Sequence, residues 1–111
     1  MNKKYTSQTQ VLNLICTHTI TNPIPQNKVC EITNLDAREV RRAIETLRRA
    51  GWLICASYDS NQGGYYLAQS KEEYERFSKS LKNKAVSIFI TIQKMGKAAV
   101  NLPTQLNLFT E

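Results

Sequence analysis

The chain has 111 residues and a net charge of +6, from fifteen Lys and Arg against nine Asp and Glu. This length supports one compact core with short appendages and excludes two ordinary domains. The positive charge favours a polyanionic partner but does not identify it.

The first part of the chain predicts a basic N-terminal arm and two helices. The arm covers residues 1–6, and a possible capping box of Ser7 and Gln10 begins the first helix. Apolar residues at helical spacing continue this helix until Pro23 closes it. Pro25 suits the first turn of a short second helix.

A third helix is predicted over residues 36–50. Asn34 precedes it at a position where a left-handed backbone is tolerated. Asp36 is spaced as an N-cap with Glu39 as its reciprocal partner, and Gly51 ends the helix. Two short helices joined by a tight turn follow from these signals.

The two faces of the third helix differ in character. At about 100° per residue, four apolar residues fall together on one face. They are Val40, Ala43, Ile44 and Leu47. The far side carries Arg38, Arg42, Glu45 and Arg49. One face is therefore expected to pack and the other to be cationic.

Beyond Gly51 the sequence predicts a β-hairpin. Residues 52–57 and 65–68 are rich in β-branched and aromatic side chains, and residues 59–64 are turn formers. The second strand is expected to return beside the first.

The last predicted element is a long helix that Ser70 and Glu73 cap. One apolar stripe runs along it, through Tyr74, Phe77, Leu81, Ala85, Ile88, Ile92 and Met95. Val86 and Ile90 lie opposite this stripe, so the second half is apolar nearly all round. We expect one side to cover the first helix and the other to form a homodimer through Val86, Phe89 and Ile90. The alternative is a monomer whose own core surrounds the helix.

This order of elements resembles the winged helix-turn-helix, particularly in small phage and mobile-element proteins of bacteria. The similarity is carried by the run from Thr33 to Leu47, by Ala50-Gly51-Trp52-Leu53 and by Gly63-Gly64-Tyr65-Tyr66-Leu67. It covers residues 7–70 and implies an α+β fold with an additional C-terminal helix at 71–100. Residues 101–111 follow as a linker and tail.

The resemblance implies a duplex DNA partner, with the third helix in the major groove and the hairpin over an adjacent groove or backbone. The positions that approach base edges correspond to Ala37, Arg38, Arg41 and Arg42. Arg48 and Arg49 are better placed for phosphate. The alternative is a solvated helix face. The expected wing tip, residues 58–64, has no Lys or Arg, so its contact with DNA stays open.

The C-terminal residues are similar to the motif that docks bacterial replication and repair proteins on the sliding clamp. The matching positions are Gln105, Leu106, Leu108 and Phe109. Such a tail places its apolar side chains in a pocket of the partner and the Gln amide at its rim. The alternative is a tail that packs on its own domain.

Other chemistry is not indicated. Cys16, Cys30 and Cys55 lie far apart among apolar neighbours, so we expect buried thiols, no zinc and a reducing, cytoplasmic location. The polar residues after the basic N-terminus do not fit a signal peptide, and residues 85–92 are too short to span a membrane. With His18 as the one histidine and no phosphate loop or paired carboxylates, we expect neither catalysis nor a cofactor.

Three functions remain possible from the sequence. The first is a phage- or mobile-element-derived accessory protein that binds DNA through helix 36–50, docks on the host clamp and acts in replication or its control. The second is a dimeric transcriptional repressor without clamp binding. The third is a protein-interaction module or clamp inhibitor whose basic face contacts no DNA. Binding to the clamp would favour the first function over the second. Failure to bind duplex DNA at low salt would favour the third.

Overall fold

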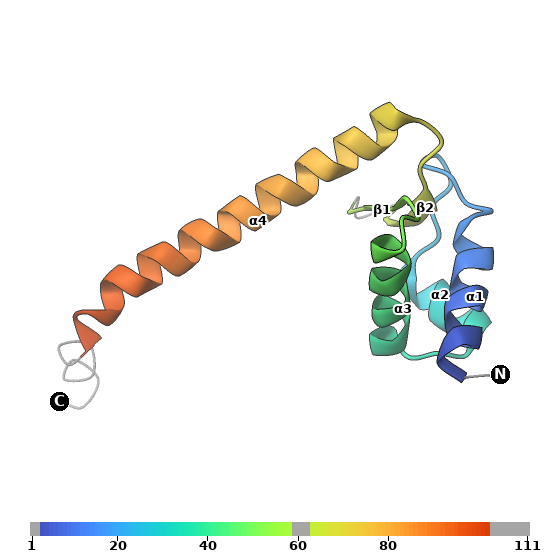
Figure 1. The fold of residues 1–111 in the computed structure, drawn as a ribbon, viewed down its shortest axis with the longest axis horizontal. Helices are drawn as coiled ribbons and strands as arrows, with labels where there is room; N and C mark the ends of the chain where they lie inside the picture. The colour runs from blue at the N-terminus through green and yellow to red at the C-terminus, as the bar shows by residue number, and fades with distance from the viewer. Residues whose placement is uncertain (1–2, 59–62, 103–111) are drawn as a thin grey trace. The chain divides into compact units, whose positions relative to one another are not determined.

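The computed structural model describes residues 3–58 and 63–102, with side chains from residue 6 onward. The chain divides into two units, Met1–Phe77 and Ser78–Glu111. The first unit holds three helices and a two-stranded hairpin (Figure 1). The second holds most of the last helix.

Helix α1, Lys3–Ile15, differs from the prediction at both ends. It begins before Ser7, so residues 3–6 are helical where we expected an arm. No Pro or Gly interrupts this stretch, and the cap predicted at Ser7 is therefore not needed to start it. The helix ends at Ile15 rather than near Pro23. Beyond it, Thr17 donates its hydroxyl to the Leu14 carbonyl at 2.8 Å, and the His18 carbonyl accepts a hydrogen bond from the Leu67 N–H of the hairpin at 3.2 Å.

Helices α2, Gln26–Thr33, and α3, Ala37–Arg49, form the predicted tight pair. Asn34 adopts the left-handed conformation, with φ 59° and ψ 35°. Gly51 follows α3 with φ 104°, a conformation that glycine accepts without a steric penalty. Both signals read from the sequence are confirmed.

The core of the first unit lies between the three helices and the hairpin. α1 packs on both α2 and α3, and α3 also contacts the first strand. The buried side chains of this cluster are Val11, Ile15, Ile24, Val29, Val40, Ala43, Ile44, Leu47 and Ile54. The predicted apolar face of α3 is thus the face that packs.

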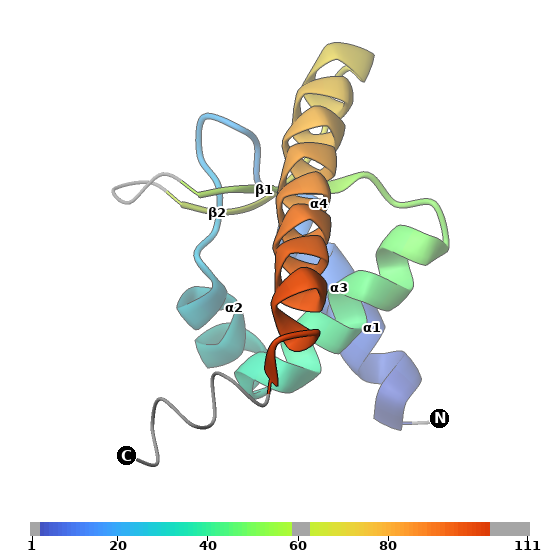
Figure 2. The ribbon, with the colours of Figure 1, turned by 90° about the vertical axis from the view of Figure 1, so that its left-hand side faces the viewer.

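Strands β1, Ile54–Ser57, and β2, Gly64–Leu67, form the antiparallel hairpin (Figure 2). Ile54 pairs with Leu67, and Ser57 pairs with Gly64. The segment after α1 joins β2 on its other side: Tyr65 and Ile24 exchange backbone hydrogen bonds of 2.8 and 2.9 Å. This pairing places Ile24, which the sequence put between the first two helices, at the edge of the sheet.

Helix α4, Lys71–Ala99, begins as predicted, with the Glu73 N–H donating to Ser70 Oγ at 3.2 Å. Phe77 is buried in a second cluster with Cys55 and Tyr66. From residue 78 onward, the large apolar side chains of α4 are exposed in the structure, including Val86 at 57%. The helix continues through Gly96 without interruption.

Two further observations concern the described residues. None of their helices is long and apolar enough to cross a membrane. All three cysteines are free thiols, but Cys55 alone is buried, while Cys30 is half-buried and Cys16 is exposed. The expectation of three buried thiols is therefore wrong for Cys16, which lies just beyond the end of α1.

Candidate nucleic-acid interface

The start of α3 is fixed by a reciprocal capping box. The Glu39 N–H donates to Asp36 Oδ1 at 2.7 Å, and the Asp36 N–H lies 3.4 Å from Glu39 Oε1. The hydrogen bond from Glu39 lowers the pKa of the Asp36 carboxyl, and the positive charge of Arg38 acts in the same direction. The first turn of the candidate interface is thus held in place by charge-assisted local bonds.

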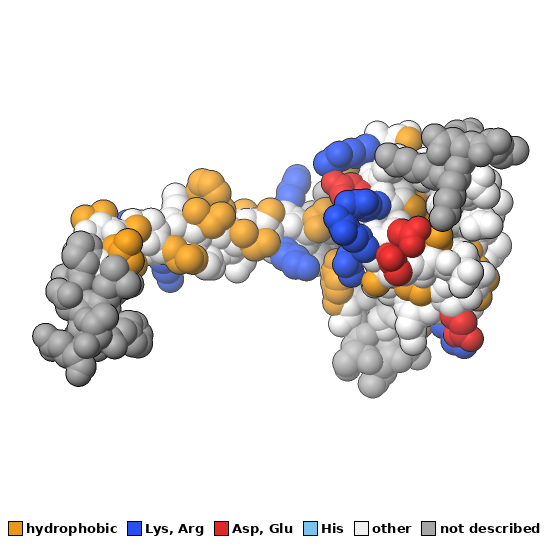
Figure 3. All heavy atoms as spheres, turned by 90° about the horizontal axis from the view of Figure 1, so that it is seen from below, with side chains coloured by type: hydrophobic (Ala, Val, Ile, Leu, Met, Phe, Trp, Pro, Cys, Tyr) orange, Lys and Arg blue, Asp and Glu red, His pale blue; other side chains and the backbone are white. Residues whose placement is uncertain are grey.

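Three of the predicted DNA-contacting side chains lie on the solvent face of α3. Arg38, Arg41 and Arg42 are exposed, whereas Ala37 is half-buried. Lys and Arg side chains gather on one face of the first unit, with Asp and Glu beside them (Figure 3). The core holds the opposite face of α3, so the arginines are presented from a rigid support.

Arg49 pairs with an acidic neighbour on the same face. Its Nη2 lies 2.7 Å from Glu45 Oε1, and both side chains are mostly exposed. An exposed pair of this kind contributes little to stability, at most about 1 kcal/mol. Arg49 can therefore exchange Glu45 for an external anion at small cost.

Arg48 is positioned differently from the other arginines. Its Nε donates to the Ile54 carbonyl at 2.8 Å, and its guanidinium carbon lies 5.1 Å from the centre of the Phe77 ring. The side chain thus joins α3 to β1 and to the first turns of α4. We predicted a phosphate contact for Arg48, and these contacts give it a role inside the fold.

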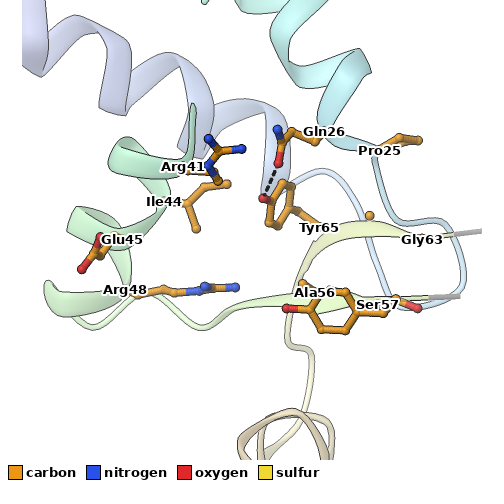
Figure 4. A pocket seen from close by; sticks show the side chains of 12 residues that line it. Pro25, Gln26, Arg41, Ile44, Glu45, Arg48, Ala56, Ser57, Gly63 and Tyr65 are labelled. Carbon is orange, nitrogen blue, oxygen red and sulfur yellow. Dashed lines mark hydrogen bonds between the residues drawn. The ribbon is translucent and has the colours of Figure 1, made fainter. Parts of the chain in front are cut away.

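A pocket of about 600 Å³ opens between α3 and the hairpin (Figure 4). Its lining comprises Pro25, Gln26, Arg41, Ile44, Glu45, Arg48, Ala56, Ser57, Tyr58, Gly63, Gly64 and Tyr65. The Tyr65 hydroxyl donates to Gln26 Oε1 at 3.1 Å, and burial raises the pKa of this phenol. Sequence reasoning did not find this site, because its walls come from α2, α3 and both strands.

Several predicted site residues lie elsewhere. Val86, Phe89 and Ile90 are on α4 in the second unit, and Phe89 is 60% exposed. The clamp-motif residues Gln105, Leu106, Leu108 and Phe109 lie outside the described residues, as do positions 59–62 of the expected wing tip.

The structure is similar to that of IscR from T. potens, a winged-helix protein. The two chains share 21% identity with a TM-score of 0.52, and the match covers 80% of this chain and 75% of that chain. No protein-family model and no curated protein matches the sequence. The predicted fold class, an α+β winged helix with an additional long C-terminal helix, is confirmed.

Proposed function

We propose that this protein is a homodimeric regulator that binds duplex DNA through α3. The observation that carries the proposal is the division of α3 into a buried apolar face and an exposed face with Arg38, Arg41 and Arg42. In winged helix-turn-helix proteins the helix at this place enters the major groove. The likeness to IscR, a winged-helix transcription regulator, supports the same function class.

Each exposed arginine suits recognition of a base edge or a phosphate. The guanidinium fork can donate two parallel hydrogen bonds to guanine O6 and N7, and it neutralises phosphate equally well. Ala37, at the start of α3, is small enough for close approach to a thymine methyl group. Arg49, once released from Glu45, would contact the DNA backbone, and Arg48 would support the helix from behind.

DNA binding is tested with duplexes selected from a random pool by the full-length protein, at several salt concentrations. We expect Arg42→Ala to lower the affinity for the selected DNA site by about 5- to 100-fold and to reduce the sequence preference at one base pair of that site. Lys71→Ala is the charge-matched control, because Lys71 is exposed and lies on α4 beside Glu75. An equal loss of DNA affinity in both variants would mean that the protein is attracted to DNA only non-specifically, by charge. If the protein binds no duplex at low salt, the proposal is rejected.

The homodimer would form through α4. Large apolar side chains on this helix are exposed in the chain by itself, among them Val86 at 57%, Phe89 at 60% and Ile90 at 45%. These three residues lie on one side of the helix, and the same side of a second copy would cover them. A two-fold dimer would present two α3 helices to a symmetric DNA site.

The oligomeric state is measured by analytical ultracentrifugation of the full chain. We expect a dimer that Phe89→Glu converts to monomer, while Lys84→Glu, on the opposite side of the same helix, leaves the dimer intact. A monomer at every protein concentration would contradict this part of the proposal and predict an asymmetric DNA site.

The C-terminal sequence favours a second, more specific role. Gln105, Leu106, Leu108 and Phe109 match each defining position of the clamp-docking motif. With DNA held at one end and the bacterial sliding clamp at the other, the protein would be a phage- or mobile-element-derived accessory factor of replication. Without clamp binding, a transcriptional repressor accounts for the fold equally well.

Binding of the purified clamp of the host distinguishes these two roles. We expect the full-length protein to bind the clamp and the double variant Leu108→Ala, Phe109→Ala to lose binding while keeping its affinity for DNA. Failure of the unaltered protein to bind the clamp would leave the transcriptional role.

A further inference from the structure

The pocket between α3 and the hairpin adjoins the outer face of α3 that we assign to DNA and shares only Arg41 with it, among the described residues. Its volume of about 600 Å³ falls in the range of small-molecule sites, about 300–1,000 Å³. In Figure 4 the side chains of Arg41 and Arg48 extend from α3 into the space between this helix and the hairpin. The lining is thus cationic on its helical side.

The charge of this lining is unbalanced. Arg41 and Arg48 contribute two positive charges, and Glu45, which also lines the pocket, lies 2.7 Å from Arg49 outside it. Nη2 of Arg48 is buried and has no hydrogen-bond partner within the described part of the chain. A buried donor without a partner is costly, so an anionic group near it would be stabilised.

The other walls offer apolar and aromatic surface. Ile44 and Pro25 are apolar, and Tyr58 and Tyr65 supply two phenol rings. Tyr65 is fixed by its hydrogen bond to Gln26 at 3.1 Å. A ring held in this way suits the flat face of an aromatic ligand.

We propose that this pocket binds a small planar aromatic molecule that carries one oxyanion group, either a carboxylate or a phosphate. Arg41 and Arg48 attract the oxyanion, and the aromatic part lies against Tyr58 and Tyr65. The walls come from both α3 and the hairpin, so the ligand holds these two elements together.

The ligand would also affect DNA binding. Arg41 lines the pocket and belongs to the proposed DNA interface, so an anion bound to it competes with DNA for the same guanidinium. This consequence rests on the proposed function, whereas binding of the ligand does not.

The test uses the full-length protein without DNA and two probes, anthranilate as the aromatic carboxylate and phenyl phosphate as the aromatic phosphate. Amide NMR spectra are followed to about 10 mM probe, a range that detects even weak binding. We expect shifts for residues of the pocket with at least one probe, and none with the neutral analogue benzamide. The probe that binds more tightly identifies the oxyanion.

Three variants locate the site. Arg41→Met removes a charge of the lining, and Ser57→Phe fills the pocket without changing charge, so each should weaken binding by about tenfold or more. Lys71→Met removes an equal charge outside the lining and should change affinity less than about twofold. Circular dichroism verifies that the variants fold.

The proposal is overturned by any of three results: no shift at the pocket with either probe, binding of benzamide as tight as that of the probes, or an equal loss of affinity for Arg41→Met and Lys71→Met. Loss of DNA binding by the unaltered protein would not affect this test, because DNA is absent from it. The two proposals therefore fail separately.

Discussion

The guanidinium of Arg48 lies over the ring of Phe77, with its carbon 5.1 Å from the ring centre. Its Nε also donates to the Ile54 carbonyl at 2.8 Å. One side chain thus joins the last turn of α3 to β1 and to the first turns of α4. Because these contacts are partly desolvated, they are worth more than an exposed ion pair.

Removal of this link should destabilise the first unit. We expect Arg48→Met to lower the free energy of unfolding by about 1–3 kcal/mol, since it deletes one charge-assisted hydrogen bond and one cation–π contact. The control Arg49→Met loses only an exposed pair and should stay within about 0.5 kcal/mol. Urea titration of both variants gives the comparison, and similar values for the two would contradict a structural role for Arg48.

A double-mutant cycle isolates the contact between Arg48 and Phe77. Combining Arg48→Met with Phe77→Leu should give a coupling energy of about 0.5–2 kcal/mol. Additive effects, with no coupling beyond error, would show that the ring and the guanidinium act independently.

Gly64 is required by a close approach of two backbone segments. A Cβ placed on it would lie 2.4 Å from the Ile24 carbonyl oxygen and 2.8 Å from the Pro25 nitrogen. Since both neighbours are backbone, Gly64→Ala must disrupt the pairing of Ile24 with Tyr65, and we expect a loss of about 2 kcal/mol or more.

Gly96 offers the opposite case, because nothing lies within 4 Å of a Cβ added there. It is inside α4, so Gly96→Ala should stabilise the helix by about 0.5–1 kcal/mol. Thermal unfolding followed by circular dichroism measures both glycine variants. Gly64→Ala with an unchanged melting temperature would contradict the close approach.

The cap of α3 predicts a pH dependence of stability. Hydrogen bonding from Glu39 lowers the folded-state pKa of Asp36 below 3.8, its ordinary value. The unfolded chain therefore binds this proton more readily, so the stabilisation is complete well above pH 3.8 and is lost as the pH falls through the folded-state pKa. The unaltered protein should therefore have a higher free energy of unfolding than Asp36→Asn at neutral pH, and this difference should shrink as the pH falls towards 3.8 and below.

Urea titrations of both proteins between pH 6 and about pH 3 measure that difference. Glu45→Gln is a matched control, because Glu45 lies on the same helix and caps nothing. If the difference in the free energy of unfolding between the unaltered protein and Asp36→Asn stays constant with pH, the Asp36 charge does not contribute to the cap.

The thiols should differ in reactivity. Burial raises the pKa of the Cys55 thiol, so little reactive thiolate is present at neutral pH. Cys16 is exposed. With iodoacetamide at neutral pH, we expect Cys16 to be alkylated first and Cys55 only on unfolding, as followed by peptide mass spectrometry. Early labelling of Cys55 in the folded protein would contradict its burial, and Cys16→Ser should remove the fast phase.

Helix ends could be predicted from the sequence wherever the signal is local. The capping box of Asp36 and Glu39, the left-handed Asn34 and the glycine after α3 each act over four residues or fewer. The C-terminal end of α1 was mispredicted because the contacts beyond it are not local. Apolar periodicity continued beyond Ile15, but the backbone there pairs with β2, which lies some forty residues further along the chain.

The sequence by itself determined the order of elements, the caps and the two faces of α3, because these depend on helical periodicity and on neighbours within a turn. Only the tertiary structure decided that Arg48 supports the fold from inside while Arg41 and Arg42 face solvent. It also decided that Gly64 meets Ile24 and that a cationic pocket opens beside α3. The physical reason is that these features are contacts between residues distant along the chain, and their geometry is set by packing of the core.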